Sequence, residues 1–407
     1  MRSEKLRSED RIITTIKNIY TINLGVKKHE RVLVFTDRIR SDEEISDSDR
    51  ERRERLIDIA RLVVDVGKGL AKEIIYVEYP ALKGHGSEPP ERLWVAAFGR
   101  ETVNEFKKNR IFTALLRKKA TEKQLSIARD CVALWKDNAV DSVIALSNFS
   151  TSHTAFRDML TRVAKTRYAS MPLFDPSMFF GAMNVNWRAL ANRTTLLAEK
   201  IKKACKVLLV TPNGTRLSVI KENRHVGTDI GILTRPGSFG NLPAGEVFFA
   251  PMEGTADGKL ILEWAPTHRL SYPICLLIKK GMVEDISGSP RTTALPPSCT
   301  QGRGEDSYAI YLRRRLSEDD NFRNIAEFGI GTNEGASRPD NILEAEKICG
   351  TVHIALGDNS SFGGKVRTPF HQDFVFFKPT VTIIYSDGNK EIILKDGRLG
   401  DRPRTII

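Results

Sequence analysis

Two strand-like segments on either side of residue 360 bring histidine and aspartate side chains toward one place. In the segment 351–356, apolar residues alternate with His353, so a core on one side leaves the imidazole on the other. In the second segment, His371 and Asp373 are two positions apart and therefore point to the same face of a strand. Glycine, aspartate and asparagine between the segments are typical of turns, so the two strands can return close together.

An imidazole and a carboxylate that point to the same place form a metal-ligand geometry. Either histidine by itself is more often an ordinary polar residue on a half-buried strand. The pair His371 and Asp373, together with His353, instead favours a metal-binding or catalytic role.

Three glutamates elsewhere in the chain could complete such a site. Glu246 follows a Pro and Gly turn at the mouth of an apolar strand, where a lone carboxylate is usually solvated. Glu327 lies among small and apolar residues, so its burial would require a cation. Glu346 lies in a helical segment seven positions before His353, although Lys347 beside it also fits an exposed surface.

Charge balance groups these acidic residues with Asp373. Two adjacent divalent ions would balance four carboxylates, those of Glu246, Glu327, Glu346 and Asp373. Oxygen and imidazole ligands without thiolate suit Zn, Mn, Co, Fe or Mg, and the sequence leaves the choice among them open.

The chain of 407 residues exceeds the size at which a single core keeps growing, which predicts two domains. Through about residue 190, strands such as 31–36 and 73–79 alternate with amphipathic helices and predict an α/β domain with a parallel sheet. From Lys206 onward, short strands between turns predict a β-rich α+β domain. We therefore expect an N-terminal domain at 1–195 and a catalytic, metal-binding domain at 196–407.

Composition argues against several other classes of protein. The five cysteines form no CxxC pair, which indicates reduced thiols in an intracellular protein. No signal-peptide core and no long apolar run occurs, so we expect a soluble cytoplasmic protein without a membrane partner. Many of the basic residues behind the net charge of +12 alternate with acidic ones, which argues against nucleic-acid binding as the primary role.

Several motifs resemble, in the same order, those of the thermophilic aminopeptidase family of metallo-aminopeptidases. They are RPGSFGNLPAGEVFFAP (235–251), EFGIGTN (327–333), EAEKICGTVHIALGDN (344–359) and HQDF (371–374), with shorter matches in the N-terminal domain. The resemblance implies a homodimer and a two-metal site with six ligands: Glu246, Glu327, Glu346, His353, His371 and Asp373. The sequence departs from the family's pattern in two places. The spacing from Glu346 to the next histidine is two residues longer, and Ser360 stands where better-known members carry a tyrosine.

From this resemblance we expect a metal-dependent aminopeptidase, a hydrolase that removes N-terminal amino acids from peptides. Its two divalent ions (Zn, Co, Mn or Mg) would polarise the scissile carbonyl and make hydroxide available at neutral pH. Glu327 or Glu346 would bridge the ions or shuttle the proton.

Two alternatives stay open. The chain also resembles, more distantly, a ring-cleaving iron dioxygenase of dihydroxypyridine with the same fold, in which His371, Asp373 and another histidine would hold one Fe(II). Retention of Glu246 and Glu327 favours the two-metal hydrolase over this enzyme. The last alternative is a non-catalytic basic protein that binds polyanions such as RNA.

Overall fold

A computed structural model describes residues 2–287 and 307–400 of the chain. The chain forms two compact units. The first unit comprises Met1–Trp187 and Gly231–Ala244, and the second comprises Arg188–Ile230 and Gly245–Ile407. The first unit thus takes a short segment from the middle of the chain. The boundary near residue 195 stays a prediction for where separately folding domains divide.

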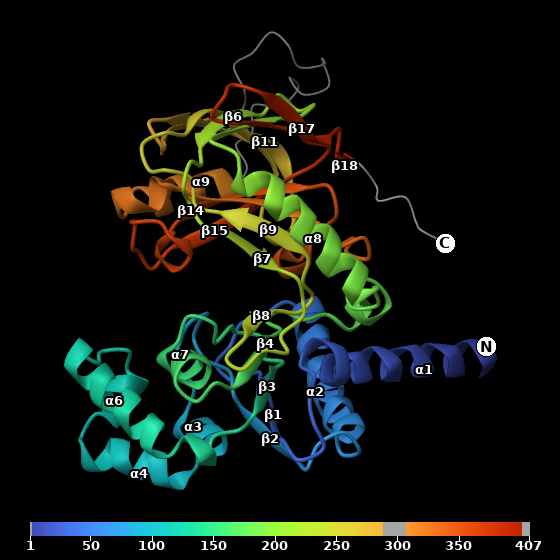
Figure 1. Cartoon of the computed structure of the whole chain (residues 1–407), viewed down its shortest axis with the longest axis vertical. Helices are drawn as coiled ribbons and strands as arrows, with labels where there is room; N and C mark the ends of the chain where they lie inside the picture. The colour runs from blue at the N-terminus through green and yellow to red at the C-terminus, as the bar shows by residue number, and fades with distance from the viewer. Residues whose placement is uncertain (1, 288–306, 401–407) are drawn as a thin grey trace. The chain divides into compact units, whose positions relative to one another are not determined.

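A parallel sheet organises the first unit. Its elements are α1 (Arg2–Asn18), η1 (Ile19–Asn23), β1 (Arg31–Arg38), α2 (Asp47–Gly67), β2 (Glu73–Pro80), α3 (Glu91–Phe98), α4 (Arg100–Lys108), α5 (Phe112–Leu116), α6 (Glu122–Leu134), η2 (Lys136–Asn138), β3 (Ser142–Ala145), α7 (Ala155–Arg162), β4 (Arg167–Ser170), η3 (Pro176–Phe180) and β8 (Phe239–Asn241). The strand order is β2-β1-β3-β4-β8, and all four pairings are parallel. Figure 1 shows α2 on one side of this sheet and α3 and α7 on the other, which explains why β1 and β3 are buried on both faces.

Trp94 of α3 lies at the centre of an aromatic core in the first unit. Its ring stacks on Phe98 at 5.4 Å and meets Phe106, Phe112 and Phe156 edge to face at 5.3 to 5.9 Å. Side chains of β1 and β3 complete this core from the sheet. Edge-to-face and offset pairs are the arrangements that aromatic rings prefer, so this cluster fixes the helices on one face of the sheet.

The second unit contains most of the antiparallel structure. Its elements are α8 (Trp187–Lys202), β5 (Lys206–Val210), β6 (Arg216–Ile220), β7 (Val226–Asp229), β9 (Glu246–Phe249), β10 (Asp257–Trp264), β11 (Arg269–Lys279), β12 (Met282–Ser287), α9 (Ser307–Leu316), η5 (Asp320–Arg323), β13 (Ile325–Gly331), α10 (Ile342–Ala345), β14 (Val352–Gly357), η6 (Ser360–Phe362), β15 (His371–Phe376), β16 (Thr380–Ile384), β17 (Lys390–Lys395) and β18 (Arg398–Leu399). They form an eight-stranded sheet, β12-β11-β10-β6-β5-β16-β17-β18, and a five-stranded sheet, β15-β14-β13-β9-β7.

The two sheets of the second unit share one hydrophobic core. Leu260 and Ile274 of the eight-stranded sheet belong to the same buried cluster as Ile354 and Phe374 of the five-stranded sheet. One face of the five-stranded sheet is therefore apolar, and its other face is free to carry polar groups. The predicted fold class is confirmed: an α/β unit with a parallel sheet precedes a β-rich α+β unit.

Four of the cysteines lie in the described part of the chain and are free thiols: Cys131, Cys205, Cys275 and Cys349. Cys299 lies outside the described residues. Within 2–287 and 307–400, every helix is too short or too polar to cross a membrane.

Candidate metal centre

The five-stranded sheet carries five of the six predicted ligands on the face away from the core. The even-numbered residues of β14 from 352 to 356 point into the core, and His353 lies on the opposite face, as the sequence predicts. Strand pairing places Glu327 of β13, Ala355 of β14 and Asp373 of β15 in one row across this face. We call it the polar face.

A β-bulge in β13 brings Glu327 to the polar face. Ile325 pairs with Leu356 and faces the core, so in a regular strand Glu327 would also face the core, two residues later. The register instead shifts by one residue between Ile325 and Glu327, and Glu327 pairs with Ala355. Because one extra residue reverses the faces of a strand, this bulge makes Glu327 available to the site.

Gly329 makes room for the imidazole of His353. The two residues are paired across β13 and β14. A Cβ atom at position 329 would lie 2.0 Å from Nε2 of His353, far inside any contact distance. Glycine at this position therefore lets the imidazole lie against β13 beside Glu327.

The more accessible part of the polar face, which we call the open half, consists of Glu327, His371 and Asp373. Nε2 of His371 lies 3.4 Å from Oε2 of Glu327 and 3.5 Å from Oδ2 of Asp373. One ligand atom from each residue lies within 4.8 Å of those of the other two. The side chain of His371 is 30% exposed. Nitrogen and oxygen donors that converge in this way fit a divalent cation.

The backbone carbonyl of Asp358 orients the ring of His371. Nδ1 lies 2.8 Å from that oxygen, which can only accept, so Nδ1 carries the proton and Nε2 faces the carboxylates. Metal-binding histidines are commonly held by such a bond. Burial opposes the charged imidazole, but Asp373 and Glu327 raise the pKa of His371 well above its ordinary value. The carboxylates thus favour positive charge at this point, from a proton or from a metal ion that displaces it.

The closed half, as we call the more buried part of the site, consists of Glu246 and His353 on the polar face together with Glu346 and Lys347 of the segment that follows α10. Nζ of Lys347 lies 2.6 Å from Oε1 of Glu246 and 3.2 Å from Oε2 of Glu346. Nε2 of His353 lies 3.5 Å from the second oxygen of Glu246 and 3.4 Å from Oε1 of Glu327. Glu246, Glu327 and His353 form a second group whose ligand atoms lie within 4.8 Å of one another.

Charges in and beside the closed half shift each other's pKa values. Burial opposes the charged forms of Lys347 and His353, but neighbouring carboxylates raise both pKa values, that of His353 to about 9. Burial, with Asp373 and Glu246, raises the pKa of Glu346 to about 8. Burial would also raise the pKa of Glu327, but hydrogen bonds from His353 and His371 lower it overall. The ammonium of Lys347 therefore stays charged next to Glu246.

All six predicted ligands lie in the second unit, and five of them form two groups that share Glu327. Glu346 belongs to neither group found among the described residues, and contacts Lys347 instead. The assignment of the six residues as ligands stays a prediction. The sequence interpretation allowed Lys347 an exposed position. In the structure its side chain is 0% exposed.

The loop after β14 uses Ser360 to order its own backbone. Its hydroxyl donates to both carboxylate oxygens of Asp358 at 3.1 and 3.2 Å. Asn359 is buried, donates to Glu253 at 3.0 Å and accepts from the backbone of Val366 at 2.9 Å. The aminopeptidase pattern has its tyrosine at the position of Ser360, next to Asn359. In this chain the side chains of both residues make hydrogen bonds that order the loop.

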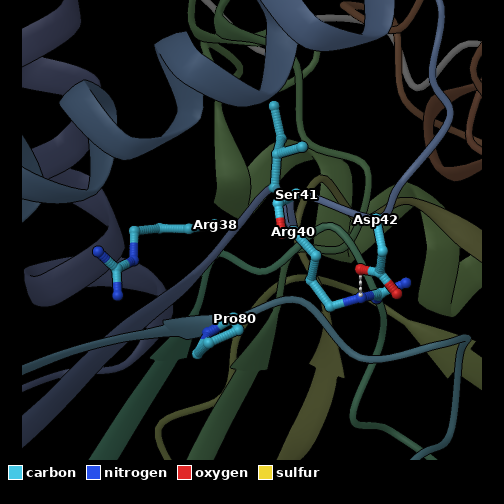
Figure 2. Close-up of a pocket in the computed structure, with 6 residues that line it drawn as sticks. Arg38, Arg40, Ser41, Asp42 and Pro80 are labelled. Carbon is cyan, nitrogen blue, oxygen red and sulfur yellow. Dashed lines mark hydrogen bonds and ion pairs between the residues drawn. The ribbon is translucent and has the colours of Figure 1, made fainter.

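A separate surface hollow lies at the carboxyl end of β1 in the first unit. Figure 2 shows Arg40 turned toward Asp42, whose carboxylate accepts a hydrogen bond of 2.8 Å from Nε. The hollow is lined by Arg38, Ile39, Arg40, Ser41, Asp42 and Pro80. Because none of the predicted ligands lines it, the metal centre on the polar face remains the candidate functional site.

Residues 182–401 match the family described as 2,5-dihydroxypyridine 5,6-dioxygenase (NicX). The match covers more than half of the chain and includes every residue of the open and closed halves. The chain is therefore a member of this dioxygenase family. No curated protein matches the sequence.

Two solved structures share the fold over nearly the whole chain. One is 2,5-dihydroxypyridine dioxygenase from Pseudomonas putida KT2440, with 16% identity, a TM-score of 0.64, and coverage of 96% of this chain and 97% of that one. The other is wild-type AmpT from Thermus thermophilus, with 13% identity, a TM-score of 0.54, and coverage of 97% and 100%. At these identities the two similarities establish the fold and nothing more. The shared fold agrees with the one that the aminopeptidase resemblance implies.

The family match corrects the predicted reaction. The expectation of a hydrolase, an aminopeptidase or metalloprotease, is wrong, because dioxygenases are oxidoreductases. The same fold carries both kinds of enzyme, so ligand-type residues on one sheet face do not by themselves determine the chemistry. Metal binding remains supported by the two residue groups, whereas the expected number of two ions has no support. A homodimer and the absence of a nucleic-acid partner stay predictions.

Proposed function

We propose that this chain is a metal-dependent dioxygenase that cleaves a hydroxylated aromatic ring of the dihydroxypyridine type. The observation that carries the proposal is the aromatic wall beside the open half. The ring of Phe362 meets His371 edge to face at 5.7 Å and Phe248 at 5.9 Å. Aromatic side chains beside a partly exposed metal centre suit a flat aromatic substrate.

The open half fits a single divalent ion such as Fe(II). Glu327, His371 and Asp373 offer two carboxylates and one imidazole without thiolate, so a glutamate stands where the predicted iron site had a second histidine. Imidazole and carboxylate donors suit Fe(II) and Mn(II). When bound, Fe(II) would supply the redox chemistry that allows molecular oxygen to react with an aromatic ring. Family membership favours iron as the ion and a dihydroxypyridine as the ring.

The side chains around the open half would orient the ring and manage its protons. Phe248 and Phe362 would hold the ring and exclude water from one side of it. Glu346 is the carboxyl beside Asp373 that would give a proton to the ring or take one from it. Glu327 would serve as a ligand instead of a proton shuttle, because it lies between two histidines.

The proposed reaction needs no further reductant. One ring carbon–carbon bond breaks, two carbon–oxygen bonds form, and both atoms of molecular oxygen enter the product. The ring is oxidised by four electrons while molecular oxygen is reduced by four, so the electrons balance.

Oxygen consumption with 2,5-dihydroxypyridine tests the proposal. Protein loaded with Fe(II) should consume one oxygen molecule per ring, and a reaction under ¹⁸O₂ should give a product that carries both labelled atoms. 2-Hydroxypyridine, which lacks the second hydroxyl, should give no uptake. Iron-loaded protein that consumes no oxygen with dihydroxypyridines or dihydroxybenzenes would contradict the proposal.

A further inference from the structure

We infer that Lys347 is an internal cation that fills the place of a second metal ion and so limits the polar face to one ion. The inference rests on the proposed one-metal centre in the open half, and it adds the reason why that centre holds a single ion. It concerns the closed half, where four ionisable side chains meet and are largely shielded from water.

The contacts of Lys347 are those of a counter-ion. Its Nζ lies 2.6 Å from one carboxylate, Glu246, and 3.2 Å from another, Glu346. The exposed fractions of the three side chains are 0%, 8% and 16%. Carboxylates buried to this degree need a cation close by, and the chain provides one.

The backbone holds Lys347 in this position. Its carbonyl accepts from the backbone N–H of Asn333 at 2.8 Å, and the next residue, Ile348, forms a β-bridge with Asn333. Gly331 allows the close approach, because a Cβ atom there would lie 2.1 Å from the carbonyl oxygen of Ile348. These backbone contacts with the residues that follow β13 fix where the side chain of Lys347 starts.

A divalent ion in the closed half would conflict with this ammonium. The ligand group there is Glu246, Glu327 and His353, and one oxygen of Glu246 already contacts Nζ of Lys347. An ion bound by Glu246 would lie next to a like charge in a site that water screens poorly. In the open half, by contrast, the ion pairs of His371 are with Glu327 and Asp373, and among the described residues neither of these carboxylates pairs with Lys347. The same carboxylates that would suit two ions in the absence of Lys347 therefore suit one ion in its presence.

Metal counting with Mn(II) tests the inference without reference to activity. The full chain is saturated with Mn(II), exchanged into metal-free buffer, and analysed for manganese per chain by mass spectrometry. We expect one ion in the wild type and two in Lys347→Met, which keeps the length of the side chain but removes its charge. Lys347→Met combined with Glu246→Gln, which weakens the second site again, should return the count to one. The exposed Lys279→Met, whose partner Glu284 is also exposed, is the matched control and should bind one ion.

Either of two results would overturn the inference. The first is a wild-type chain that takes up two ions, and this result counts whether or not Lys347→Met folds. The second is a Lys347→Met variant that is folded, as judged by its circular dichroism, and still binds one ion. These results are separate from the oxygen assay, because a chain could cleave rings with two ions or bind one ion without cleaving any.

Discussion

The open and closed halves of the polar face neutralise buried carboxylates in different ways. In the closed half, the fold supplies the positive charge through Lys347, whose side chain is 0% exposed. In the open half, the side chain of His371 is 30% exposed, and positive charge must come from protons on the imidazole or from a bound ion. From this comparison we expect acidic residues on one sheet face to act as metal ligands only where the fold does not provide its own cation.

The largest expected effect comes from removing the internal cation. Lys347→Met should lower the free energy of unfolding in chelator by about 3–5 kcal/mol, because Glu246 and Glu346 would stay buried without their partner. Lys279→Met breaks an exposed pair and should cost about 0–1 kcal/mol. Urea denaturation measures both, and equal effects of the two substitutions would remove the distinction between a buried counter-ion and a surface charge.

The next effect concerns the open half. His371→Ala should weaken metal binding by more than about 100-fold, because changes to residues that only support a ligand already cost up to about 100-fold. The fold should stay intact, because His371 is partly exposed. Gln372→Ala, in the same strand but facing the other way, should keep the wild-type affinity. Titration calorimetry with Mn(II) measures the affinities, and full binding by His371→Ala would place the ion elsewhere.

The substitution Gly329→Ala tests whether His353 is a ligand of the bound ion. Its Cβ would displace the imidazole of His353, which should cost about 1–3 kcal/mol in stability. The metal count should stay at one, since His353 belongs to the closed half. Gly84→Ala, where no atom lies within 4 Å of the new Cβ, should leave stability close to that of the wild type. Loss of the metal from Gly329→Ala at full stability would show that His353 is a ligand of the bound ion.

The smallest effects concern the loop that orients His371. The carboxylate of Asp358 accepts from the backbones of Ser360 and Thr368 at 3.1 and 2.9 Å, so Asp358→Ala should loosen the loop and weaken metal binding about tenfold. Ser360→Ala removes one hydroxyl from an exposed position and should change the affinity less than about twofold. Calorimetry that ranks the two in the opposite order would assign the hydroxyl of Ser360 a direct role at the metal.

The sequence predicts the parts of the fold that depend on local periodicity. The alternation around His353 and the spacing of His371 and Asp373 place these side chains on one face, as the structure has them. The strand β8 is not predicted, because three residues carry no measurable period and its parallel partner β4 is distant in the chain.

The features that long-range contacts create could not be predicted from the sequence. The bulge that turns Glu327 to the polar face depends on how β13 pairs with β14, and no turn residue marks it. Lys347 reads as a surface residue in a charged segment, and only its contacts with Glu246 and Glu346 show that it is a counter-ion. The leading prediction of the reaction class was wrong and its dioxygenase alternative fits better, because one fold can carry different chemistries and the types of ligand residue do not distinguish them.

Anomalous diffraction from crystals soaked in Mn(II) tests the central claim most directly. We predict one strong peak per chain, at about 2.0–2.3 Å from ligand atoms of Glu327, His371 and Asp373, and no peak beside Lys347. A second peak between Glu246 and His353, or a single peak there with the open half empty, would contradict the account.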